Sequence, residues 1–249
     1  MCIRDRKKRG AFLVMSNIVI GIEGYVGAGK SAICRELLNH IPNSIILEGG
    51  NLYRAIVYSL LKSGIDLSNL KQNMSHVDIK SIMEKLKITI AIENRQTAIY
   101  IDEKKIDEEK LQSAQSSLAV SEIGTIANND KLYEFGRKII DQFKEKYNVI
   151  VSGRALMEIY PNLDYHFMIT ASLDERIRRK SIQYNNKIDL EELKQNIQRR
   201  DELQEKAGYY KIYDKTIVVD VSECKNVQAS AKKVLSFIKK ENIDNGFCE

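Results

Sequence analysis

The sequence predicts an α/β fold, in which helices flank a parallel five-stranded sheet. Short runs rich in β-branched residues alternate with helical patterns along the chain, and this alternation indicates βαβ units. The runs are nearly all apolar, which is typical of strands covered on both faces. A glycine-rich segment joins the first run to the first helix, at the sheet edge where ligands bind in such folds.

Hydrophobic periodicity places each element of this fold along the chain. Five strands are expected at 18–22, 44–47, 148–151, 165–169 and 216–219. Six helices are expected at about 29–40, 50–63, 131–146, 172–184, 189–206 and 226–240.

The stretch 66–130 breaks the alternation of strands and helices. It predicts a small β-hairpin at 87–92 and 97–101, a second turn at 103–105 and a helix at about 113–127. An insertion of this length between two strands indicates a subdomain that folds over a substrate. The core is then expected to comprise residues 15–65 and 131–240, followed by a polar tail at 241–249.

The positive charge of the chain is concentrated in its first ten residues. The net charge is +5, and five basic residues against Asp5 supply +4 of it before Gly10. The remainder therefore carries a charge of only +1, which does not indicate a nucleic-acid-binding protein. Residues 1–14 are interpreted as a non-native or disordered leader, since the alternative, a secretory signal, would need a longer apolar core and a cleavage site.

The cysteines and histidines do not form a recognisable metal or disulfide pattern. Four cysteines lack C-x-x-C spacing, so a reducing cytoplasm is expected, and no apolar run is long enough to span a membrane. Cys34 is expected in the core. His40, His76 and His166 are isolated in sequence and are expected to be structural or exposed rather than catalytic.

The glycine-rich segment fits the pattern G-x-x-x-x-G-K-[ST] and stands between an expected strand and helix. Backbone N–H groups in such a loop wrap a polyphosphate, a lysine reaches the outer phosphates, and a hydroxyl binds Mg²⁺. A glycine-rich turn that fits the pattern by chance is the alternative, which this context disfavours. The expected nucleotide-binding residues are Gly24, Gly27, Ala28, Gly29, Lys30 and Ser31, with Ser31 also the metal ligand.

A basic helix near residues 176–180 indicates a lid at about 176–205. Arginines on a mobile flap neutralise charge that develops during phosphoryl transfer and help to exclude water. Arg176 and Arg179 are therefore candidate catalytic residues beside Lys30. The alternative is a solvated helix face with internal ion pairs, such as Glu175 with Arg179.

Two further arginines follow expected strands directly. Arg54 lies just after the second strand, and Arg154 lies at the end of the third strand, in Ser152-Gly153-Arg154. Because both positions face the glycine loop, these residues suit an anionic second substrate better than a core role.

From Asn17 to Lys240, the chain resembles bacterial cytidylate (CMP/dCMP) kinases, which belong to the P-loop nucleoside monophosphate kinases. The resemblance is carried by the loop, Tyr53-Arg54, Gly153-Arg154, the basic lid and the hairpin insertion. It implies transfer of the γ-phosphoryl group of Mg·ATP to CMP or dCMP, with the insertion binding the acceptor. It also implies that the acceptor is contacted by Arg54, Ser121, Arg154 and Arg200. The protein is expected to be a monomer.

Several positions depart from the pattern of that family near the acceptor. They are Gly49, Asp130, Ser152, Ala155 and Gln204. Glu23 and Glu48 keep acidic groups where the family carries aspartate, near the expected Mg²⁺ and acceptor. A small-molecule kinase with another acceptor, or a non-catalytic nucleotide-binding protein, are therefore the alternatives.

Overall fold

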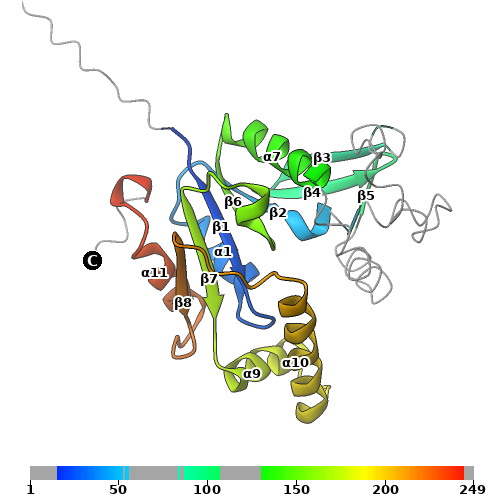
Figure 1. The fold of residues 1–249 in the computed structure, drawn as a ribbon, viewed down its shortest axis with the longest axis vertical. Helices are drawn as coiled ribbons and strands as arrows, with labels where there is room; N and C mark the ends of the chain where they lie inside the picture. Colours follow the sequence, from blue (N-terminus) through cyan, green and yellow to red (C-terminus); the bar gives the residue numbers. More distant parts are fainter. Residues whose placement is uncertain (1–15, 53, 56–83, 85–86, 107–129, 244–249) are drawn as a thin grey trace, which may run out of the picture.

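The structure, a computed structural model, describes residues 16–52, 54–55, 84, 87–106 and 130–243 and confirms the α/β architecture (Figure 1). Five parallel strands lie in the order β2-β6-β1-β7-β8. They are β1 Val19–Gly24, β2 Ser44–Glu48, β6 Asn148–Ser152, β7 Tyr165–Thr170 and β8 Thr216–Asp220. Every bound lies within about two residues of the prediction, which is the usual precision of boundary assignment.

The predicted hairpin is present but does not form a sheet of its own. Its strands are β3 Ile88–Glu93, β4 Gln96–Ile101 and β5 Lys104–Lys105, and β4 pairs in parallel with β2. The Arg95 side chain donates to the carbonyl oxygens of Ser44, at 2.9 Å, and Ile41, at 3.2 Å. These contacts bridge about fifty residues, so local sequence could not show that the hairpin extends the central sheet to eight strands.

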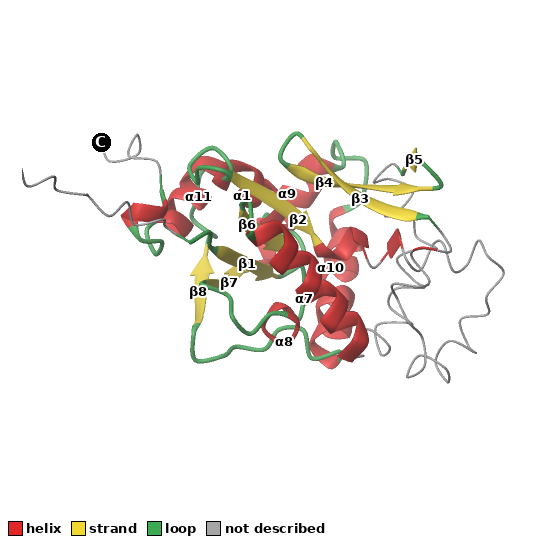
Figure 2. Cartoon of the chain, turned by 90° about the horizontal axis from the view of Figure 1, so that it is seen from above, coloured by secondary structure: helices red, strands yellow, loops and turns green. Residues whose placement is uncertain are grey.

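Helices cover both faces of the sheet (Figure 2). They are α1 Lys30–Leu37, α7 Asp130–Lys144, α8 Leu156–Ile159, α9 Leu173–Gln183, α10 Leu190–Lys206 and α11 Val227–Leu235, followed by the 3-10 helix η2 Lys240–Asn242. On β1, Val19 packs with α7 and α8, whereas Ile20 packs with α1 and α11. This alternation buries both sides of the strand and creates two apolar cores.

Helices α9 and α10 form the pair that was expected as a lid, and they lie at the end of β1 where the glycine loop turns (Figure 1). Ser172 caps α9 by accepting from the Glu175 amide, and Asp189 caps α10 by accepting from two amides. Val26 of the loop is buried in a small apolar cluster with Leu193 and Ile197 of α10. Helix α10 is therefore packed directly on the loop.

Some expectations fall outside the described residues. These are the leader, most of the helix at 50–63, His76, the helix at 113–127 with Ser121, the side chain of Asp130 and the end of the tail. The helix α8 was not predicted, because four residues are too few to show a helical period. Within the part of the chain that the structure describes, no helix has the length and apolar character needed to cross a bilayer.

Candidate active site

The glycine loop has the strand–loop–helix geometry that its sequence predicts. A Cβ on Gly24 would lie 2.2 Å from the Ile169 carbonyl oxygen, so no larger residue fits beside β7. Gly29 precedes α1 with a φ of 97°, a conformation that favours glycine. The N-terminal turn of α1 therefore opens directly from the loop, as an anion-binding site requires.

Lys30 returns from α1 to the start of its own loop. Its Nζ donates to the Gly24 carbonyl oxygen at 3.2 Å, and the guanidinium of Arg154 approaches the same oxygen at 3.5 Å. Burial, and then the positive charge of Arg154, lower the pKa of Lys30 to about 7. Burial likewise lowers the pKa of Arg154. Two cations, one from helix α1 and one from the turn after β6, thus converge at one point, where an anion would relieve their repulsion.

The two predicted acceptor segments lie next to each other. Glu48 of β2 is in register with Ser152 of β6, so the segments that follow both strands emerge at the same edge of the sheet. A Cβ on Gly49 would lie 3.5 Å from the Ser152 carbonyl oxygen. Arg54 donates to the Asn51 side chain at 3.1 Å, within the helical segment that follows β2.

Arg200 belongs to the same electrostatic field. It is exposed on α10, and its charge contributes to the lowered pKa of Lys30, Arg154 and Lys180. Three predicted site residues, Lys30, Arg154 and Arg200, are therefore close enough for their charges to interact. Lys180 belongs to the same group of cations, although the sequence analysis did not predict it as a site residue. Ser121, the fourth expected acceptor ligand, lies outside the described residues.

Arg176 of α9 is buried against the loop. Its guanidinium donates to the carbonyl oxygens of Val26, at 3.2 Å, and Ala171, at 3.1 Å, and pairs with Asp201 of α10. Asp201 in turn accepts from the Val26 amide at 3.4 Å. These contacts attach helices α9 and α10 to the loop. Arg176 would have to exchange them for phosphate oxygens in order to bind a phosphate group.

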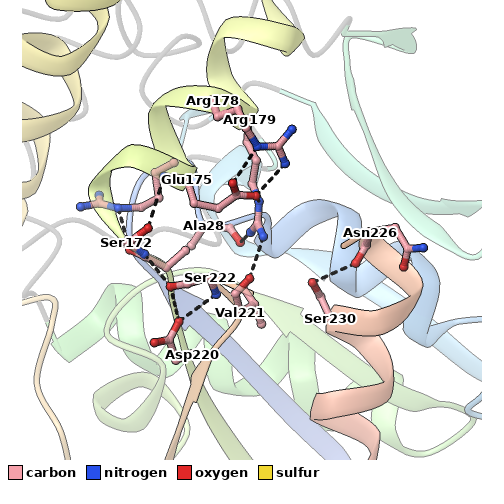
Figure 3. A network of polar contacts seen from close by, with 12 residues as sticks. Ala28, Ser172, Glu175, Arg178, Arg179, Asp220, Val221, Ser222, Asn226 and Ser230 are labelled. Atoms are coloured by element: carbon pink, nitrogen blue, oxygen red, sulfur yellow. Dashed lines mark hydrogen bonds and ion pairs between the residues drawn. The ribbon is translucent and has the colours of Figure 1, made fainter. Parts of the chain in front are cut away.

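Arg179 is held by a second network, which includes Ala28 of the loop and Val221 after β8 (Figure 3). It donates to the carbonyl oxygens of Ala28, at 3.0 Å, and Val221, at 2.7 Å, and to Glu175 at 2.7 Å. Hydrogen bonds from Arg178 and Arg179 lower the pKa of Glu175 to about 2, with Arg178 the stronger cause. The internal ion pair considered for this helix therefore exists, and it orients Arg179 toward the loop.

The acidic residue before the loop, Glu23, is buried and contacts residues of two other segments. Glu23 accepts from the Leu156 amide at 2.6 Å, and its other oxygen lies 3.5 Å from Nε2 of His166. Nδ1 of His166 is 2.9 Å from the Thr216 hydroxyl, and both side chains of the Glu23–His166 pair are almost fully buried. Glu23 thus anchors the turn that carries Arg154, a role different from the magnesium-side position expected for it.

Other single-residue expectations have clear outcomes. His166 and His40 are structural, as expected, since His40 pairs with Glu36 at 3.3 Å. Cys34 is buried in the core, as expected, and burial raises the pKa of its thiol to about 12, which disfavours the reactive thiolate. No group of three or more His, Cys, Asp or Glu side chains suited to a metal occurs in the described ranges. Ser31 is exposed at the start of α1, so its hydroxyl is accessible to a metal that arrives with a nucleotide.

Sequence reasoning missed the residues that join the lid to the loop. Asp201, Tyr25 and Tyr210 come from three separate segments, and no local pattern marks them as neighbours. For the Glu23–His166 pair the sequence did contain one signal. Glu23 in β1 and His166 in β7 are each an ionisable residue in an otherwise largely apolar strand.

Comparison with known proteins agrees with this geometry. The family model described as "Cytidylate kinase" matches residues 20–240. A cytidylate kinase from Clostridioides difficile (strain 630) is 34% identical over 194 residues, which cover 76% of this chain and 82% of that protein. One from Alkaliphilus oremlandii (strain OhILAs) is 27% identical over 233 residues, covering 90% of this chain and 99% of that protein. Because the match runs from the loop through the lid to the last helix, the chain belongs to the cytidylate kinase family.

Proposed function

We propose that the protein transfers the γ-phosphoryl group of ATP to CMP, with dCMP as a second acceptor, giving the nucleoside diphosphate and ADP. Membership in the cytidylate kinase family supports this activity. The observation that carries it is the convergence of Lys30, from the donor loop, and Arg154, from the acceptor turn, on the Gly24 carbonyl oxygen. The cations needed for the two substrates are therefore neighbours before either substrate is bound.

The chain would act mainly by positioning and by neutralising charge, since phosphoryl transfer needs little covalent chemistry from the protein. Amides of the loop and the first turn of α1 would hold the β- and γ-phosphates of ATP, and Lys30 would contact the transferring group. The polyphosphate would restore the full charge of Lys30, because a nearby anion raises the pKa of an ammonium group.

Arg54, Arg154 and Arg200 would bind the phosphate of the acceptor and direct it toward the donor. Arg176 and Arg179 would exchange carbonyl acceptors of the loop for phosphate oxygens as the lid moves. We propose Ser31 as the protein ligand of a magnesium ion, which would offset the negative charge of the phosphate groups.

An acceptor panel tests the proposed activity. ADP formation would be measured with CMP, dCMP, UMP, AMP and a shikimate-like alcohol, with and without Mg²⁺. We expect CMP and dCMP to give rates well above the rate without acceptor, and chelation of the metal to abolish them. Turnover with CMP no faster than without acceptor would refute the assignment, and a faster rate with another acceptor would identify the altered substrate.

The remaining expectations belong to the same proposal. We propose a cytoplasmic monomer in which residues 66–130 bind the acceptor and about 176–205 act as the lid, with a core at 15–65 and 131–240. Sedimentation at micromolar concentration would test the monomer, and protection of 66–130 from hydrogen exchange by CMP alone would test the acceptor role of the insertion.

A further inference from the structure

We propose that Tyr210 is a positioning residue that couples Arg154 on the acceptor side to the phosphate loop and so favours transfer to the acceptor over transfer to water. The inference rests on the proposed kinase function. It concerns a side chain from the segment after α10, which is remote in sequence from both the loop and the turn that it joins.

The ring of Tyr210 stands between the two halves of the site. Its centroid lies 4.2 Å from that of Tyr25, the first residue after Gly24 in the loop. The guanidinium carbon of Arg154 lies 5.8 Å from the centre of the Tyr210 ring, and that of Arg176 lies 5.3 Å from the centre of the Tyr25 ring. Arg154, Tyr210, Tyr25 and Arg176 thus form a continuous series of cation–π and ring contacts from acceptor turn to lid.

The Tyr210 hydroxyl adds a second attachment. It donates to Asp201 at 3.1 Å and also contacts the Gln204 side-chain oxygen. Asp201 is the same carboxylate that pairs with Arg176 and accepts from the Val26 amide. One ring and one carboxylate therefore connect the loop, the acceptor turn, α9 and α10.

The local sequence explains how Tyr210 reaches this place. Helix α10 ends in a Schellman motif, with Gly208 at a φ of 76°. The Tyr209 amide donates to Gln204 and the Gly208 amide to Glu205, at 3.0 and 2.9 Å. This motif reverses the chain directly after the lid helix, and the next residue, Tyr210, is directed back to the loop.

The position of Tyr210 implies two separable effects of its loss. Arg154 would lose the ring that fixes its guanidinium, and the acceptor would bind less tightly. The lid would also lose part of its contact with the loop, so that water could reach the γ-phosphoryl group and ADP and inorganic phosphate would form without an acceptor.

The experiment compares Tyr210→Leu and Tyr210→Phe with a matched control, Tyr184→Leu. Tyr184 follows the last residue of α9, and its ring stacks on neither Tyr25 nor Arg154. For Tyr210→Leu we expect the acceptor KM to rise about tenfold, with the ratio of ATP hydrolysis to transfer also raised. For Tyr210→Phe, which keeps the ring, we expect an acceptor KM within about threefold of the wild type.

A second readout separates this inference from the proposed function. Hydrogen exchange of α10 and of the first turn of α9, measured without nucleotide, should become faster in Tyr210→Leu and stay unchanged in Tyr184→Leu. If the wild type failed to phosphorylate CMP, the proposed function would fail, and the exchange data and the hydrolysis rate would still decide the coupling. Equal behaviour of Tyr210→Leu and Tyr184→Leu would overturn it. If Tyr210→Leu did not fold, Tyr25→Leu would provide the same comparison from the loop.

Discussion

The proposed donor and acceptor sides of this site differ in how their residues are assembled. The donor loop is built from consecutive residues, Gly24 to Ser31, between one strand and one helix. The proposed acceptor side draws on the helical segment after β2, the turn after β6 and helix α10, which are separated by up to about 150 residues. The comparison shows that a contiguous motif positions its own groups, whereas a distributed site depends on the register of the sheet.

The two sides also differ in what holds them in place. Backbone conformation fixes the loop, since Gly24 and Gly29 occupy positions that exclude or disfavour a side chain. Side chains from other elements fix the acceptor turn, through Glu23 below Leu156 and Tyr210 beside Arg154. Substitutions on the donor side should therefore lower kcat, whereas those on the acceptor side should first raise the KM for the acceptor.

The largest effect is expected for Lys30→Ala, which removes a cation from the transferring phosphate. Turnover should fall at least about 100-fold, since one such transition-state contact contributes roughly 3 kcal/mol. The measurement is kcat for ADP formation with saturating ATP and CMP. A loss smaller than about fivefold would mean that the loop is not the active centre.

Arg154→Ala should produce a smaller and more selective effect. We expect the acceptor KM to rise about 10- to 100-fold, because a hydrogen bond to a charged group contributes about 1.5–3 kcal/mol. Arg54→Ala should act in the same direction, and the KM for ATP should change less than threefold in both. Equal changes in both KM values would remove the proposed division between donor and acceptor sides.

Glu23→Gln should weaken the support beneath the acceptor turn. Loss of the buried charge opposite His166 should lower the free energy of unfolding by about 2 kcal/mol. Denaturant unfolding of Glu23→Gln, His166→Asn and the double variant would measure the coupling of the pair. Additive effects within about 0.5 kcal/mol would show that the two side chains do not interact.

The buried ammonium of Lys30 should make stability depend on pH. Its pKa in the folded protein is about 7, against an ordinary value of 10.5, so the unfolded chain binds more protons between these values. The contribution of Lys30 to the unfolding free energy therefore rises from pH 7 to 10. Lys30→Met should be at least about 1 kcal/mol more stable than the wild type at pH 7, and its advantage should shrink toward pH 10. A constant difference across this range would contradict the assigned burial.

The smallest effect is expected away from both sides. Lys138 and Glu134 form an exposed i,i+4 pair on α7. Lys138→Ala should change the unfolding free energy by less than about 0.5 kcal/mol and should leave both KM values unchanged. A larger change in KM would show that general surface charge, rather than the clustered cations, controls substrate binding.

The sequence by itself determined the strand–helix order and the place of the glycine-rich loop between β1 and α1. These features are local, because period, glycine placement and residue spacing are set by neighbours in the chain. It also placed Arg54 and Arg154 correctly at strand ends, since parallel strands end at a common edge.

Only the tertiary structure decided that the hairpin joins the central sheet, that Glu23 faces His166, and that Tyr210 lies between Arg154 and Tyr25. Each of these contacts joins residues that are distant in sequence. Their side chains meet through strand register and helix packing, and the energies involved depend on burial, which a linear pattern does not encode.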